Sequence, residues 1–183
     1  MSGKRMRRLL AELAARTAGG LERPAAPEAL MRALCDAMAE RQGRPLHLYF
    51  RPFPDGLGAS GLYLDFDGAA TIIVEERTTP EHQLLILGHE LWHLEQGDHG
   101  HLAADAAAAA RSFTDDGGGW DGVVAVAARA VSDGGAESAA ETFGLLCRGR
   151  FGPWLREQGA GEPVGQDTVE GRIASALEPR PRP

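Results

Sequence analysis

Two histidines and a glutamate stand close together in the segment HELWH, where His89, Glu90 and His93 follow a His-Glu-x-x-His spacing. On an α-helix, residues four apart lie on the same face, so the two imidazoles can converge on one cation. Zinc accepts imidazole nitrogens and keeps a position for water where the protein supplies three ligands. Glu90 directly follows the first histidine, so we expect its carboxylate to lie beside that water as a general base. The spacing therefore predicts hydrolytic chemistry at a Zn²⁺ ion held by His89 and His93.

The alternative is a chance match to this spacing on an exposed helix. The residues around the motif are mainly leucine, isoleucine and tryptophan, which indicates a buried helix. Burying two histidines and a glutamate together is costly unless they are paired or bind a metal. The context therefore favours the metal site.

A third ligand can come from either of two places. His99 lies six residues after His93, the spacing of the HExxHxxGxxH motif, but Gln96 stands where that motif has glycine. His101 is a nearby variant of the same arrangement. The second source is Glu137, which has Glu141 one helical turn further on.

In the second arrangement one carboxylate binds the metal and the other can hold a ligand histidine. The alternative for Glu137 and Glu141 is a solvated helix face. The residues alone leave the choice between His99 and Glu137 open.

The elements that must position these residues follow from periodicity and turn chemistry. Helices are predicted over residues 5–17, 28–42, 78–97 and about 136–148, and strands over residues 45–53, 61–66 and 71–75. Thr79 and Pro80 are typical of a helix start with a threonine cap, and Gly97 is typical of a helix end. Short connections between the strands favour an antiparallel meander.

The predicted fold class is α+β, a small three-stranded antiparallel sheet packed on the His-Glu-x-x-His helix, as in a minimal zincin. We expect a single domain over residues 1–178. It comprises N-terminal helices (1–43), the sheet (44–77), the motif helix (78–97), and a loop with the third-ligand helix (98–155). Residues 179–183 are expected to form a disordered tail.

The amino-acid composition favours some cellular compartments and some classes of partner over others. The chain of 183 residues has a formal net charge of -7, which favours no direct nucleic-acid binding. The apolar run after the basic N-terminal residues is interrupted by Glu12 and Arg16, and no window is apolar enough to cross a membrane. Only two cysteines occur, far apart, which is typical of a reducing compartment. A cytoplasmic protein is therefore predicted.

Several segments together resemble the ImmA/IrrE family of minimal zinc metallopeptidases, in particular its actinobacterial branch labelled "toxin" or "regulator component". They are GRPLHL at residues 43–48, GLY at 61–63, EERTTPEHQ at 75–83 and ILGHELWH at 86–93. A downstream helical segment beginning at Glu137 also resembles the family pattern, with Ala140, Phe143 and Gly144 in matching places. The similarity covers roughly residues 30–155. In the family, the first glutamate of this segment is the third zinc ligand, so the resemblance implies that Glu137 has this role.

The sequence departs from the family pattern in three places. Trp92 stands where glycine is common, residues 145–148 read LLCR in place of Leu-Met-Pro, and no helix-turn-helix is visible. Any DNA-binding partner is therefore expected to be a separate protein.

The resemblance implies a gluzincin-like hydrolase that performs limited proteolysis of an intracellular regulatory protein, such as a helix-turn-helix repressor. The alternative is a non-proteolytic, zinc-bound interaction module, a toxin–antitoxin or regulator component that sequesters a transcription regulator. Both keep the metal and the fold, and only the peptidase needs Glu90 as a base. A substrate peptide could add as a strand to a sheet edge beside the zinc.

Other polar and aromatic side chains receive smaller roles. Tyr63, His99 and His101 are candidates to donate to an oxyanion. His82 is interpreted as a cap or surface residue rather than a ligand. Trp120, in a glycine-rich stretch, is either a lid anchor or a core residue.

Overall fold

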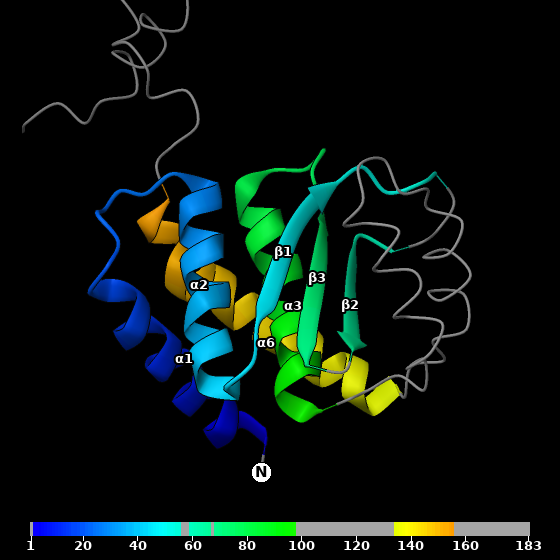
Figure 1. Ribbon diagram of the computed structural model, residues 1–183, viewed down its shortest axis with the longest axis horizontal. Helices are drawn as coiled ribbons and strands as arrows, with labels where there is room; N and C mark the ends of the chain where they lie inside the picture. Colours follow the sequence, from blue (N-terminus) through cyan, green and yellow to red (C-terminus); the bar gives the residue numbers. More distant parts are fainter. Residues whose placement is uncertain (1, 56–58, 67, 98–133, 156–183) are drawn as a thin grey trace, which may run out of the picture.

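The computed structural model describes residues 2–55, 59–66, 68–97 and 134–155. Helices cover one face of a three-stranded sheet, which confirms the α+β class (Figure 1). In chain order the elements are α1 (Ser2–Ala18), α2 (Pro27–Gln42), β1 (Leu46–Arg51), β2 (Gly61–Phe66), β3 (Ala69–Glu75), α3 (Pro80–Gln96), α6 (Gly134–Phe151) and the short 3₁₀ helix η1 (Gly152–Trp154). No helix in these described ranges is long and apolar enough to cross a membrane.

The sheet is mixed, so the predicted antiparallel meander is wrong. The strand order is β1-β3-β2, with β2 antiparallel to β3 and β1 parallel to β3. The tight turn at Gly68, whose φ is 93°, does join β2 and β3 as a hairpin. The connection over residues 52–60 is longer, so β1 does not have to form a hairpin with β2 and pairs with β3 instead. Residues 70–74 of β3 are all buried, so this β-branched strand takes the central position.

Local signals placed the helix ends correctly. Helices α2 and α3 both have proline in the first turn, and they end at Gly43 (φ 68°) and Gly97 (φ 65°) in the left-handed region. The threonine cap needs a correction. Thr79 occupies the N-cap position of α3, but its side chain makes no capping hydrogen bond. The start of α3 is held instead by the Gln83 amide, which donates to the carbonyls of Glu75 and Glu76.

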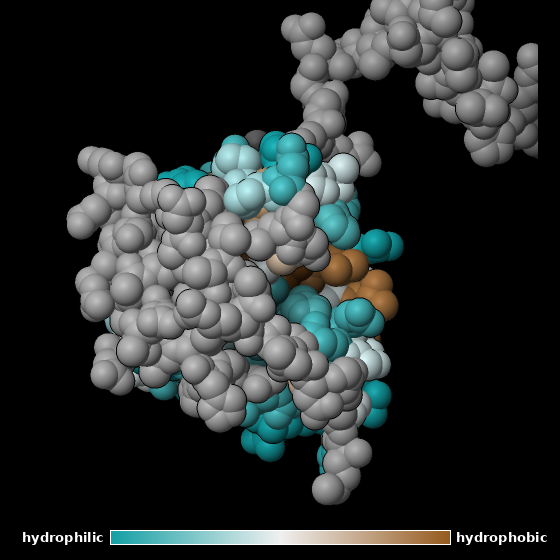
Figure 2. Space-filling model, turned by 90° about the vertical axis from the view of Figure 1, so that its right-hand side faces the viewer, coloured by the Kyte–Doolittle hydropathy of each residue, from teal (hydrophilic) through white to brown (hydrophobic). Residues whose placement is uncertain are grey.

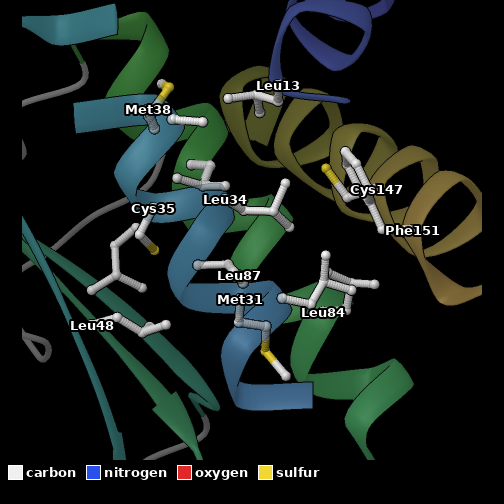
Figure 3. Packing of buried hydrophobic residues seen from close by; sticks show 14 of the residues in the cluster. Leu13, Met31, Leu34, Cys35, Met38, Leu48, Leu84, Leu87, Cys147 and Phe151 are labelled. Carbon is white, nitrogen blue, oxygen red and sulfur yellow. The ribbon is translucent and has the colours of Figure 1, made fainter. Parts of the chain in front are cut away.

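Helix α3 lies at the centre of the hydrophobic core. Its residues Leu84, Leu87 and Leu91 are fully buried. Figure 3 shows Met31 and Leu34 of α2 close to α3, and Cys35 of α2 on the side of the sheet residue Leu48. The prediction that the motif helix is buried is therefore confirmed. Such close packing on several sides holds the helix in one position.

A buried carboxylate ties the end of α3 to the two N-terminal helices. The Glu95 side chain is only 4% exposed. It accepts hydrogen bonds from Arg5 of α1, at 3.0 and 3.2 Å, and from Arg41 of α2, at 3.0 Å from each of two nitrogens. Burial raises the pKa of Glu95, but the bonds from Arg41 and Arg5 outweigh it and the pKa is lowered.

We expect Glu95→Gln to destabilise the fold at pH 7 by about 1–3 kcal/mol, the usual contribution of hydrogen bonds to a charged group. Because the pKa is lowered in the folded state, this stabilisation is present above the usual glutamate value and is lost as the pH falls through the lowered one. Urea unfolding at a series of pH values should therefore show the wild type and the variant converging in acid. Glu40→Gln, at an exposed ion pair with Arg16, is the control and should change stability little. A constant difference at all pH values would contradict this role.

Candidate metal centre

The structure brings together two histidines of α3 and one glutamate of α6. The Nε2 atoms of His89 and His93 lie 3.0 Å apart. Glu137 reaches both, with Oε2 at 3.4 Å from His89 Nε2 and Oε1 at 3.4 Å from His93 Nε2. Within the described ranges these are the residues whose ligand atoms form a group that could hold a metal ion, with all of them within 4.8 Å of one another. All three are partly buried.

The spacing of these atoms fits a shared ion. Tetrahedral zinc with bonds of about 2.0–2.1 Å has neighbouring ligand atoms about 3.3 Å apart. Each histidine Nε2 has a different Glu137 oxygen at 3.4 Å, close to this value, and the distance between the two Nε2 atoms is slightly shorter. Two imidazoles and a carboxylate are also a donor set that zinc favours. The three residues can therefore hold a metal ion at one point between α3 and α6.

The protonation of His89 agrees with a ligand role. Burial lowers the pKa of His89, and repulsion from His93 lowers it further, while Glu137 and Glu141 act in the opposite direction. The net shift is downward, which favours the neutral imidazole that a metal requires.

Close packing of two helices sets the position of Glu137. A Cβ atom on Gly144 of α6 would lie 2.6 Å from the Leu85 carbonyl oxygen of α3. A Cβ atom on Gly88 would lie 2.7 Å from the Cβ of Cys147. These glycines let the backbones approach, and Glu137 lies two turns before Gly144 on the same side of α6. Sequence reasoning missed the role of Gly88 and Gly144 in holding the site, although glycine inside a helix is a signal of close approach.

We expect Gly144→Ala to destabilise the protein by about 1–3 kcal/mol, the usual cost of overpacking, and to weaken metal binding. The added methyl group pushes α6 away from α3 and moves Glu137 from the histidines. The matched control is Gly149→Ala on the same helix, where a Cβ atom meets nothing within 4 Å. This control should leave metal affinity unchanged and stabilise the helix slightly. Thermal unfolding and zinc titration of both variants test the expectation, and equal metal affinities would contradict it.

Glu90, also on α3, lies against β2, because a Cβ atom on Gly61 would come within 2.5 Å of Glu90 Oε1. The residue is buried, with 8% exposure. Burial raises its pKa to about 8, Glu137 adds to the rise, and a backbone hydrogen bond from Tyr63 opposes it. Because the charge of Glu137 acts on it, the Glu90 carboxylate is near the metal-binding group without belonging to it.

The Tyr63 hydroxyl, one of the candidate oxyanion donors, is already engaged. It donates to Asp65 Oδ2 at 2.6 Å and accepts from Arg44 at 3.1 Å. Its single proton therefore serves Asp65. Burial and the Asp65 hydrogen bond raise its pKa, so the hydroxyl stays protonated.

The other predicted residues fall outside the group. His82 is an exposed residue in the first turn of α3, as expected for a surface residue. Trp92 is buried against Phe143 of α6, with ring centroids 5.1 Å apart. The structure does not describe His99, His101, Trp120 or the tail at residues 179–183, so the predictions for them lie outside the described residues.

Comparisons of the chain with protein-family models, with curated proteins and with solved structures found no match.

Proposed function

We propose that the protein is a zinc-dependent peptidase. The observation that carries this proposal is the convergence of His89, His93 and Glu137 on one point, with the buried Glu90 on the same helix as the histidines and within the electrostatic influence of Glu137. The resemblance of the motif segments to the ImmA/IrrE metallopeptidases supports the same conclusion from the sequence.

In this proposal His89, His93 and Glu137 hold the ion. A bound zinc ion would polarise the scissile carbonyl and lower the pKa of a coordinated water to about 7. The Glu90 carboxylate would take a proton from the attacking water and later donate it to the leaving amine. Its burial suits this work, because a carboxyl group with a raised pKa gains and loses a proton near neutral pH. The same burial keeps competing water away from the carboxylate.

Among the described strands, β2 lies at one edge of the sheet, and this supports a route for a peptide substrate. The Glu75 N–H donates to the Ser60 carbonyl, and this places the bonded pairs of the ladder at alternate residues. The main-chain groups of Gly61, Tyr63 and Asp65 therefore point away from β3. A peptide could add here as a strand through the groups other than the Tyr63 N–H, which already donates to Glu90.

On the face shown in Figure 2, the described residues are mostly hydrophilic, with a small apolar patch. Among the described large apolar side chains, Leu145 of α6 is the exposed one, at 56%. We propose, from the family resemblance, that the substrate is an intracellular regulatory protein such as a helix-turn-helix repressor.

The test is to incubate the zinc-loaded protein with the product of the neighbouring open reading frame, and to identify fragments by mass spectrometry. Cleavage at one or a few peptide bonds, abolished by a chelator and restored by zinc, is the expected result. Stable binding of an intact partner by the zinc-loaded protein would contradict the peptidase and favour a sequestering module.

A further inference from the structure

We propose that Gly61 is a positioning residue, whose missing side chain gives the Glu90 carboxylate its place against β2. This rests on the proposed function, because Glu90 is the general base there. Strand β2 supplies none of the three metal-ligating side chains. A change at Gly61 can therefore displace the Glu90 carboxylate without changing the residues that bind the ion.

The first support is steric. A Cβ atom on Gly61 would lie 2.5 Å from Glu90 Oε1 and 3.2 Å from its Cδ. Real Cβ atoms essentially never approach another heavy atom within 3.0 Å. The Glu90 carboxylate therefore occupies the space that any other side chain at position 61 would fill.

Backbone conformation does not explain the glycine. The described glycines with positive φ are Gly43, Gly68 and Gly97, and Gly61 is not among them. It lies in a regular strand, paired with Val74 of β3. Glycine is unfavourable in a strand unless something approaches closely, and here α3 approaches.

The second support is the main chain two residues later. The N–H of Tyr63 does not belong to the β2–β3 ladder, because residues 62 and 64 make the bonds to β3. It points away from β3 and donates a hydrogen bond to the Glu90 side chain. One strand thus contacts the carboxylate twice, by van der Waals contact at Gly61 and by the Tyr63 N–H. Together these contacts limit the rotamers that Glu90 can adopt.

A purely structural role for Gly61 is the alternative, because its Cβ would also lie 2.5 Å from Ile86 Cγ2. The two roles differ in what happens to Tyr63. A backbone N–H that makes no hydrogen bond to a neighbouring strand exchanges its hydrogen with solvent quickly, unless another group accepts a bond from it. The exchange rate of the Tyr63 amide therefore reports the placement of Glu90 directly, without any substrate.

The experiment is hydrogen exchange by NMR on the full-length protein. In the wild type, the Tyr63 amide should be protected. Glu90→Ala and Gly61→Ala should each raise its exchange rate by about tenfold or more, while the amides of Leu62 and Leu64, bonded to β3, keep their protection. The double variant Gly61→Ala/Ile86→Ala relieves the clash with Ile86 and leaves the one with Glu90, so its Tyr63 amide should still exchange quickly.

Restored protection in the double variant would overturn the proposal, as would equal Tyr63 exchange in the wild type and in Glu90→Ala. The readout is independent of cleavage. Failure of the peptidase would show as no substrate turnover with a protected Tyr63 amide. Failure of this inference would show as an unprotected amide in an active enzyme. Zinc uptake by Gly61→Ala should match the wild type, because the ligands come from α3 and α6.

Discussion

Replacing Glu137 with alanine is expected to abolish stoichiometric zinc binding. The variant keeps two imidazoles on one helix but loses the carboxylate that lies 3.4 Å from each of them. Mutating a residue that only holds a metal ligand in place typically lowers metal affinity by about 10- to 100-fold. Removing a direct ligand should cost more, so we expect zinc affinity to fall by about 100-fold or more. Competition for zinc with a chromophoric chelator measures it.

The matched control is Glu141→Ala, one turn further along the same helix. Glu141 is exposed and lies outside the metal-binding group, so we expect this variant to bind zinc with an affinity within about tenfold of the wild type. His99→Ala tests the other ligand that the sequence allows. Full zinc retention by Glu137→Ala, together with loss in His99→Ala, would remove Glu137 from the site.

Glu90→Gln is expected to lower the rate of peptide cleavage by about 10²- to 10⁴-fold, the usual contribution of a general base. Zinc content should stay at the wild-type level, because Glu90 is not in the metal-binding group. Stability should be kept or improved, because burial raises the pKa of Glu90, so that keeping this carboxyl group folded opposes its ionisation, and glutamine removes that cost. The cleavage rate, the zinc content and the melting temperature are measured on the same preparation.

Glu81→Gln, an exposed acid in the first turn of the same helix, controls for the loss of a negative charge. Wild-type cleavage by Glu90→Gln would rule out Glu90 as the base, and the function would then need another proton acceptor or a non-enzymatic role.

Local chemistry in the sequence predicted most of the helices and strands. Pro80 and Gly97 mark the ends of α3 because proline and glycine act on the backbone of their own turn. The sheet topology could not be predicted in the same way. Whether β1 pairs with β2 or β3 depends on which strand is buried on both faces, and that is decided by long-range packing.

In the candidate site, too, local features could be predicted from the sequence and long-range contacts could not. His89, Glu90 and His93 belong to one helix, so their spacing alone predicts their arrangement. Glu137 lies on a different helix, and the residues alone could not choose it over His99. Its position near the histidines depends on close contact at Gly88 and Gly144, which no periodic pattern encodes. The contact of Gly61 with Glu90 is equally invisible in the sequence, because it joins a strand to a helix.

Metal analysis of the purified, folded protein tests the central claim most directly. If His89, His93 and Glu137 form a metal site, elemental analysis should find about one zinc ion per chain, removed by a chelator and taken up again on addition of zinc. The double variant His89→Ala/His93→Ala should take up none. A folded wild-type protein that contains no stoichiometric divalent ion, and binds none when it is supplied, would contradict the account.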